Sequence, residues 1–121
     1  MALLAAVLAA APDCRAAAPV QAAIDYAGRV APIFQKFCGD CHAGGAEEGE
    51  LALDRITAKL DPAGDHHKWL AVWENLRAQT MPPADQPQPT DAERDLAVHW
   101  IEQAVFQLDP ARPDPGRVTV R

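Results

Sequence analysis

The sequence predicts an all-α domain in which three to four helices are joined by long loops. Apolar residues recur every three to four positions in three stretches, residues 24–37, 69–76 and 96–108. Glycine or proline is frequent between these stretches, and no segment shows the alternation of a half-buried strand. Loops of that length in a small domain indicate that the helices fold around something.

The first predicted helix leads into a short cysteine-containing motif. Its apolar face is formed by Tyr26, Val30, Ile33, Phe34 and Phe37. Pro32 either occupies the first turn of a helix that begins near Ala31 or kinks a longer helix. In both cases the motif, which starts at Cys38, lies at or just beyond the helix C-terminus. Residues 42–50 then form a glycine-rich loop, and residues 51–60 form a short helix or an irregular packed segment.

Two further helices flank a proline-rich loop. Asp65 is the candidate N-cap of the first, whose apolar stripe ends near Thr80. Four prolines keep residues 81–89 extended and semi-rigid, because proline lacks a backbone donor and fixes φ. Residues 90–93 have the Thr-x-x-Glu pattern of a capping box and open the last helix, which residues 109–110 end. Its apolar face is formed by Leu96, Trp100, Ile101, Ala104, Val105 and Leu108.

Length and composition limit the chain to one small domain. It has 121 residues, of which residues 19–109 are expected to fold. Aromatic residues make up only 6%, so an apolar core alone gives marginal stability at this size. The formal net charge of −6 argues against nucleic-acid binding, which requires clustered Lys and Arg. An acidic surface suits a positive or neutral partner, although its simplest role is solubility.

Residues 1–18 are predicted to be a signal peptide. The apolar run at residues 2–11 is too short to span a bilayer but suits an export signal, and the alanines at 16–18 fit a small-x-small cleavage pattern. No Lys or Arg precedes the run, and the alternative is a disordered alanine-rich N-terminus. The residues before Cys14 do not match a lipid-attachment site. The expected location is periplasmic or otherwise extracytoplasmic, with no stable membrane span in the mature chain.

The sequence Cys38-Gly39-Asp40-Cys41-His42 is the pattern of a c-type haem attachment site. Two thiols three positions apart can each add to a vinyl group at the porphyrin edge, and the histidine that follows then lies under the iron. This haem is attached outside the cytoplasm, which agrees with the predicted export. A covalently held haem would also supply apolar area that the chain lacks.

Cys38 and Cys41 have other conceivable uses. A thioredoxin-type redox pair belongs to a βαβ setting, which the sequence lacks. A zinc site needs a second ligand pair, but the remaining cysteine is Cys14, and neighbouring His66 and His67 point in different directions on a helix. A structural disulfide between the two thiols stays open. None of these alternatives explains why a histidine follows directly.

Met81 is the candidate for the iron ligand opposite His42. Its thioether is a soft, neutral ligand suited to ferrous iron, and His/Met ligation raises the reduction potential. It follows a helix and heads a proline-stiffened loop, whereas a core methionine would lie on an apolar stripe. Ligation by His66, His67 or His99 is the first alternative, and an open sixth position is the second.

Weaker predictions concern the surroundings of the haem. The nitrogen of His42 that does not bind iron should donate to a carbonyl, with residues 51–62 as the expected source. Arg55, Trp73 and Arg77 are candidate partners for the haem propionates, because guanidinium and indole N–H groups both donate. Solvated arginines and a core tryptophan are the alternatives.

Beyond the motif, the chain resembles class I cytochrome c and, more narrowly, planctomycete-type cytochrome c domains. The matching stretches are residues 30–44, 51–54, 73–83 and 100–102, and the likeness covers about residues 26–108. The Met-Pro-Pro segment at the right distance from the haem motif makes the combination specific. The resemblance implies an all-α class I cytochrome c-like fold around one covalently attached haem c, with the first and last helices crossing near the haem edge.

Residue by residue, the resemblance implies thioethers at Cys38 and Cys41 and axial ligation of the iron by His42 and Met81. It also implies one-electron transfer without a catalytic residue, to and from redox partner proteins. Domains of this type usually sit at one end of longer proteins. Residues 110–121 resemble a linker to a following domain, which would then be the natural partner.

The sequence thus predicts an exported, monomeric, monohaem c-type cytochrome that carries single electrons and is not itself an enzyme. One alternative is a haem enzyme or sensor with an open or His-ligated sixth position. The other is a haem-free module that uses the cysteine pair for zinc binding or protein interaction.

Overall fold

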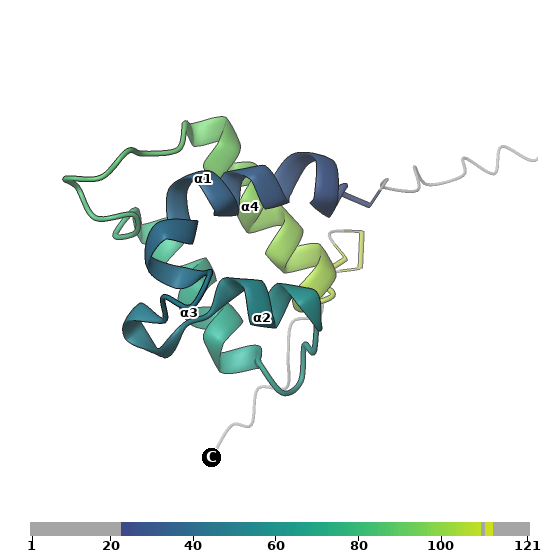
Figure 1. Cartoon of the computed structure of the whole chain (residues 1–121). Helices are drawn as coiled ribbons and strands as arrows, with labels where there is room; N and C mark the ends of the chain where they lie inside the picture. Colours follow the sequence, from purple (N-terminus) through teal and green to yellow (C-terminus); the bar gives the residue numbers. More distant parts are fainter. Residues whose placement is uncertain (1–22, 110, 113–121) are drawn as a thin grey trace, which may run out of the picture.

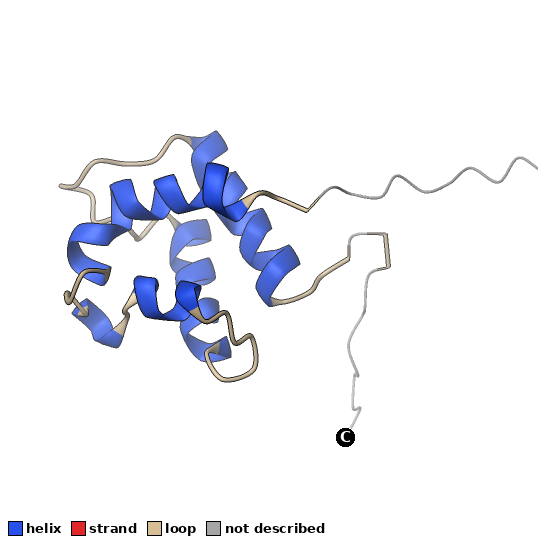
Figure 2. Cartoon of the chain, turned by 45° about the vertical axis from the view of Figure 1, so that its right-hand side comes forward, coloured by secondary structure: helices blue, strands red, loops and turns tan. Residues whose placement is uncertain are grey.

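The computed structural model describes residues 23–109 and 111–112 of the chain. Its elements, with η for a short π or 3-10 segment, are η1 Tyr26–Val30, α1 Ala31–His42, η2 Glu48–Glu50, α2 Leu53–Ala58, α3 His66–Ala78, α4 Asp91–Trp100 and η3 Ile101–Val105. Within these residues every element is helical (Figure 2), which confirms the predicted all-α class. The predicted signal peptide, residues 1–18, and the tail beyond Arg112 lie outside the described residues.

A continuous helical segment carries the cysteine motif. η1 opens at Asp25, whose carboxylate accepts a hydrogen bond of 3.2 Å from the Gly28 amide. Pro32 lies in the first turn of α1, where the missing N–H would have no helical partner anyway. α1 ends at His42, so the motif forms its last turns, in agreement with the predicted place at a helix C-terminus.

The first and last helical segments cross each other (Figure 1). Aromatic side chains fill the crossing. The ring centroids of Tyr26 and Trp100 lie 4.7 Å apart. The Phe34 ring lies 6.2 Å from Trp100 and 6.4 Å from Trp69, which is fully buried on α3. Such aromatic pairs each contribute roughly 0.5–1.5 kcal/mol beyond their buried area. This aromatic cluster is the centre of the core and fixes α1, α3 and α4 relative to one another.

Asp65 occupies the N-cap position of α3, as predicted, although its side chain accepts no capping hydrogen bond and pairs with Lys68 at 3.2 Å. The predicted extent of the last helix is wrong. Leu108 is 53% exposed and takes no part in the buried face of the last helix. The reason is that η3 ends at Val105 and Gln107 takes a left-handed φ of 55°, so the chain turns away before it reaches Leu108.

α4 begins with the predicted capping box. The Thr90 hydroxyl accepts a hydrogen bond of 3.2 Å from the Glu93 amide, and the Glu93 carboxylate accepts one of 2.8 Å from the Thr90 amide. Two backbone donors at the helix start are thereby satisfied. The box sets the point at which the proline-rich loop ends and α4 begins.

We expect Thr90→Ala to lower the free energy of unfolding by about 1 kcal/mol, because it removes the side-chain half of the cap. The hydrogen bonds from Thr90 also lower the pKa of Glu93, so the cap contributes fully above the ordinary glutamate pKa and weakens as the pH falls through the lowered value. Urea unfolding followed by tryptophan fluorescence at neutral and acidic pH measures both effects. Thr90→Ser keeps the hydroxyl and is the control. Equal stability of the Ala and Ser variants at neutral pH would contradict the prediction.

Candidate haem-binding site

Two adjoining cavities meet at residues that the sequence predicts to bind haem. The larger, of about 290 Å³, lies between α1, α3 and the segment that joins η2 to α2. The smaller, of about 170 Å³, lies between the end of α1 and the proline-rich loop. Cys38, His42 and Met81 line both cavities. A thiol, an imidazole and a thioether from two distant parts of the chain therefore border the same hollow.

The wall of the larger cavity is mainly apolar, as the site of a porphyrin requires. Its apolar part is formed by Phe34, Leu51, Leu53, Ala71, Val72 and Leu76. Phe34 also belongs to the aromatic cluster, so the cavity borders directly on the core. Water is poorly stabilised along such a wall, whereas the flat apolar faces of a haem would be well matched to it.

Cys38 and Cys41 lie three positions apart near the end of α1, on one side of the helix. Both thiols are free. Burial raises the pKa of Cys38 to about 11, against an opposing effect of the Arg94 charge. The negative charge of Glu48 is the main cause that raises the pKa of Cys41. Both groups are therefore thiols and not thiolates at neutral pH.

His42 ends α1 with one ring nitrogen turned into the protein. Nδ1 is buried and has no hydrogen-bond partner among the described residues. The prediction that a carbonyl from residues 51–62 accepts from it is therefore wrong. The carbonyls of Ala52 and Leu53, where α2 begins, accept hydrogen bonds from within that helix instead. Because Nδ1 faces inward, Nε2 is the nitrogen left for a ligand in the cavities that His42 lines.

Met81 lies two residues beyond the left-handed Gln79 that ends α3. Its side chain is accessible, with 42% of the residue exposed, so it is not a core methionine. Its backbone is held, because the carbonyl accepts a hydrogen bond of 2.9 Å from the Arg94 guanidinium. An accessible thioether on an anchored backbone is what a ligand held in place for a metal requires.

Arg94 was missed by the reasoning from sequence. It is only 6% exposed and is the one charged residue in the buried core of the described residues. It shares the buried face of the last helical segment with Ala97, Val98 and Ile101. The sequence carries a signal for this placement. Arg94 lies three, four and seven positions before these apolar residues, and that spacing puts it on the apolar face of a helix.

The three competing histidines lie in different surroundings. His67 lines the larger cavity together with His42 and Met81. The ring of His66 lies 5.4 Å from that of Phe106, and His66 lines neither of the two cavities. His99 is exposed on α4. His67 is therefore the remaining alternative to Met81 as a ligand.

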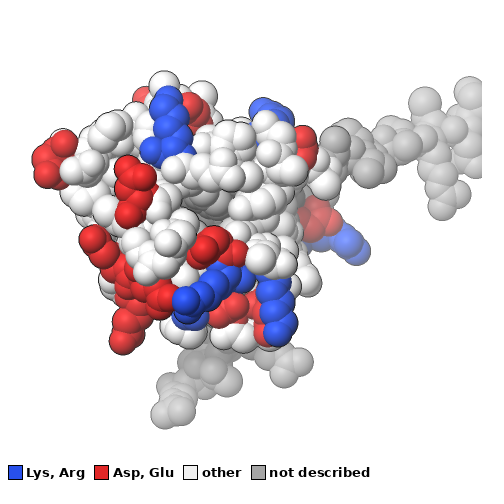
Figure 3. Space-filling model, viewed as in Figure 1, with Lys and Arg blue, Asp and Glu red and all other residues white. Residues whose placement is uncertain are grey.

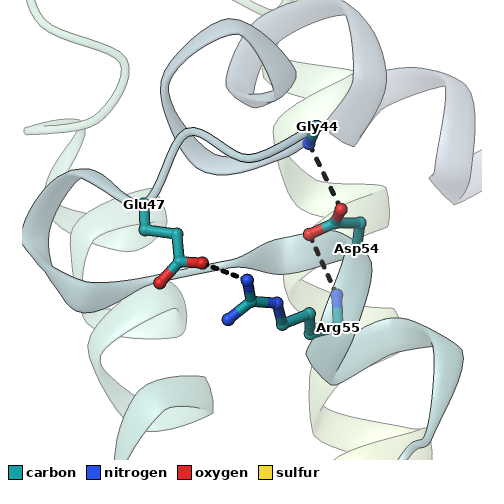
Figure 4. Close-up of polar contacts among 4 residues, drawn as sticks. All are labelled: Gly44, Glu47, Asp54 and Arg55. Atoms are coloured by element: carbon teal, nitrogen blue, oxygen red, sulfur yellow. Dashed lines mark hydrogen bonds and ion pairs between the residues drawn. The ribbon is translucent and has the colours of Figure 1, made fainter.

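The three candidate partners of the haem propionates are engaged elsewhere. Trp73 Nε1 donates to Glu102 Oε1 at 2.9 Å, and the Arg77 guanidinium lies 3.6 Å from the same oxygen. Arg55 pairs with Glu47, as Figure 4 shows. None of the three lines either of the two cavities described above, so the predicted pairing gains no support. Their contacts instead join α3 to η3 and the loop after α1 to α2.

Asp54 holds the glycine-rich loop against α2 (Figure 4). Its carboxylate accepts hydrogen bonds of 3.2 Å from the Gly44 amide and of 3.0 Å from the Arg55 amide. Gly44 and Gly45 have φ values of 63° and 97°, which a residue with a side chain adopts only under strain. The chain that leaves His42 is therefore fixed just beyond the motif.

Acidic side chains gather at the lower left of the face in Figure 3, where Figure 1 places the chain between α1 and α2. Glu47, Glu48 and Glu50 are exposed in this segment. Their negative charge lies beside the cysteine motif, and a solvated face accounts for it without any ligand.

The described residues also bear on membrane and zinc binding. None of their helices combines the length and the apolar character needed to cross a membrane. Nor do three or more of their His, Cys, Asp or Glu side chains gather closely enough to hold a metal ion. Within this part of the chain, the zinc alternative therefore lacks a ligand set.

Comparisons with known proteins identify one family. Its sequence model, described as cytochrome c oxidase, cbb3-type, subunit III, matches residues 27–101. No curated protein and no solved structure gives a significant match to the chain. The matched range covers more than half of the 121 residues and includes α1 to α4 with the whole cysteine motif. It supports the likeness to cytochrome c, while the narrower likeness to planctomycete-type domains stays a prediction. The chain, with its free thiols, its inward-turned imidazole and its apolar cavity, thus belongs to the cytochrome c oxidase, cbb3-type, subunit III family and is a c-type cytochrome domain.

Proposed function

We propose that the chain is an exported monohaem cytochrome that carries single electrons through an iron bound by His42 and Met81. The observation that carries the proposal is the shared border of the two cavities, where Cys38, His42 and Met81 meet. The family implies covalently bound haem c and haem-based electron transfer. When bound, the haem supplies an iron that alternates between the ferric and ferrous states.

Each residue of the site has one task in this proposal. Cys38 and Cys41 would hold the haem through thioether bonds at the end of α1. His42 Nε2 and the Met81 thioether would bind the iron. The apolar wall formed around Phe34 keeps water from the iron and so helps to set the reduction potential. No side chain is required to act as an acid, a base or a nucleophile.

A haem enzyme or sensor is the second candidate function. The position of His67 in the wall of the larger cavity favours it, because a histidine there offers either a sixth ligand or a polar group near an open site. The accessible thioether of Met81, with its backbone anchored by Arg94, favours electron transfer over this alternative.

The proposal includes location and partners. Domains of this family usually work outside the cytoplasm, which supports the predicted signal peptide at residues 1–18. The partners are redox proteins or a following domain of the same protein, and the chain acts as a monomer. The exposed acidic residues Glu47, Glu48 and Glu50 suit a partner whose docking face is positive or neutral.

Expression together with a haem-attachment system, followed by an absorption spectrum and an intact mass, tests the proposal. We expect a mass increase of one haem and a low-spin spectrum with the weak red band of sulfur bound to ferric haem. A high-spin spectrum would support the enzyme or sensor, and a low-spin spectrum without the red band would support ligation by His67. A colourless product with two reactive thiols would refute haem binding altogether.

A further inference from the structure

The guanidinium of Arg94 joins three separate parts of the chain. Nη1 donates to the Leu76 carbonyl at 3.2 Å and to the Met81 carbonyl at 2.9 Å. Nη2 donates to Gln88 Oε1 at 3.1 Å. One planar group on α4 thus binds the end of α3, the head of the proline-rich loop and a residue near the end of that loop.

The cation is buried without an anionic partner. Arg94 is 6% exposed, and no carboxylate of the described residues lies within ion-pairing distance of it. Its charge is compensated by three neutral oxygens, one of which is the carbonyl of Leu76 in the last turn of α3, where the helix dipole is negative. Burial of a charge costs free energy. If packing were the only requirement, an apolar residue at this position would give a more stable fold.

The proline-rich loop depends on this contact because it has few backbone hydrogen bonds of its own. Four of the nine residues from 81 to 89 are prolines, which have no amide to donate. One backbone hydrogen bond within the loop, from the Gln86 amide to the Pro83 carbonyl at 2.9 Å, is present. Otherwise Gln88 Nε2 donates to the carbonyls of Pro82, Pro83 and Gln86 at 3.1, 2.8 and 3.0 Å. Gln88 is in turn oriented by Arg94.

We infer that Arg94 is a positioning residue that holds Met81 in place as an iron ligand, with Gln88 as a relay to the rest of the loop. The inference rests on the proposed ligation by Met81. A thioether on a backbone fixed from α4 needs no search to return to the iron after it dissociates, so external ligands compete with it poorly. A freely moving loop would lose this advantage.

Imidazole titration of the haem-loaded protein tests the inference, with the red sulfur-to-iron band as the readout of Met81 displacement. We expect Arg94→Gln to raise the apparent affinity for imidazole about tenfold or more, because at least one charged hydrogen bond to the loop is lost. Arg94→Lys keeps the charge but not the fork-shaped donor set, and it should raise the affinity as well. A similar rise in both variants assigns the effect to geometry rather than charge.

Two further variants keep the test decisive. Gln88→Ala leaves the core intact and should raise the imidazole affinity by a smaller factor, which covers the case in which Arg94→Gln does not mature. Arg77→Gln removes an equal charge at an exposed position of α3 and should leave the affinity unchanged. A purely structural role of Arg94 would lower stability towards urea without changing the imidazole affinity.

The outcomes separate this inference from the proposed function. If the parent protein shows the red band and neither Arg94→Gln nor Gln88→Ala changes the imidazole affinity, the positioning role is refuted while ligation by Met81 stands. If the parent protein lacks the red band, Met81 is not the ligand and both ideas fail together.

Discussion

Replacing Met81 with Ala is expected to remove the weak red absorption band of the ferric protein and to lower its reduction potential, while the haem stays covalently attached. The thioether stabilises ferrous iron relative to ferric iron, so its loss favours the oxidised state. Axial ligands control a span of roughly 0.8 V among haem proteins, and loss of one should be a large change on that scale. Redox titration, an absorption spectrum and an intact mass of the same sample measure the three effects.

His67→Ala is the matched control, because His67 lines the same cavity and is the competing ligand. It should leave the band in place and change the potential far less than Met81→Ala does. The opposite pattern, with the band and potential intact in Met81→Ala and the spectrum altered in His67→Ala, would replace His/Met ligation by ligation through two histidines.

The double replacement Cys38→Ala and Cys41→Ala should abolish covalent attachment of the haem. Each thiol supplies one bond to the porphyrin edge, and the chain has no other cysteine in its described part. Intact mass after maturation, and haem extraction with acidified organic solvent, measure the loss. We expect a polypeptide without added mass and a haem that is fully extractable.

Cys14→Ala serves as the control for the double replacement, since Cys14 lies in the expected signal peptide and has no task at the haem. It should mature with the same mass increase as the parent protein. Retention of covalent haem by the double variant would refute attachment through the motif. Loss of haem in Cys14→Ala would show that the third cysteine takes part in the attachment.

Local patterns explain why most of the fold could be predicted from the sequence. The capping box at Thr90 and Glu93, the proline-rich loop and the place of the motif at the end of α1 each depend on a few neighbouring residues, and the structure has all three. The end of the last helix could not be read in this way. Leu108 keeps the helical spacing in the sequence, but the left-handed Gln107 turns the backbone before it.

The parts of the site that were missed depend on contacts between distant segments. The spacing of Arg94 places it on the apolar face of the last helix, but its partners, the Leu76 and Met81 carbonyls, are supplied only when α4 packs against the end of α3. In the same way, Trp73 and Arg77 look available for haem propionates until η3 brings Glu102 to them. Spacing along a helix predicts which face a residue occupies, but it does not name the partner that the fold supplies.

The side chains of the aromatic cluster at the crossing of α1 and α4 pack against one another, and Phe34 is the one that also borders the larger cavity. Helix α1, which carries Cys38 and Cys41, is therefore held in part by packing among side chains and not only by contacts with the porphyrin. Trp69 and Trp100 lie in that cluster next to the cavity. Quenching of their fluorescence would therefore report the time course of haem binding.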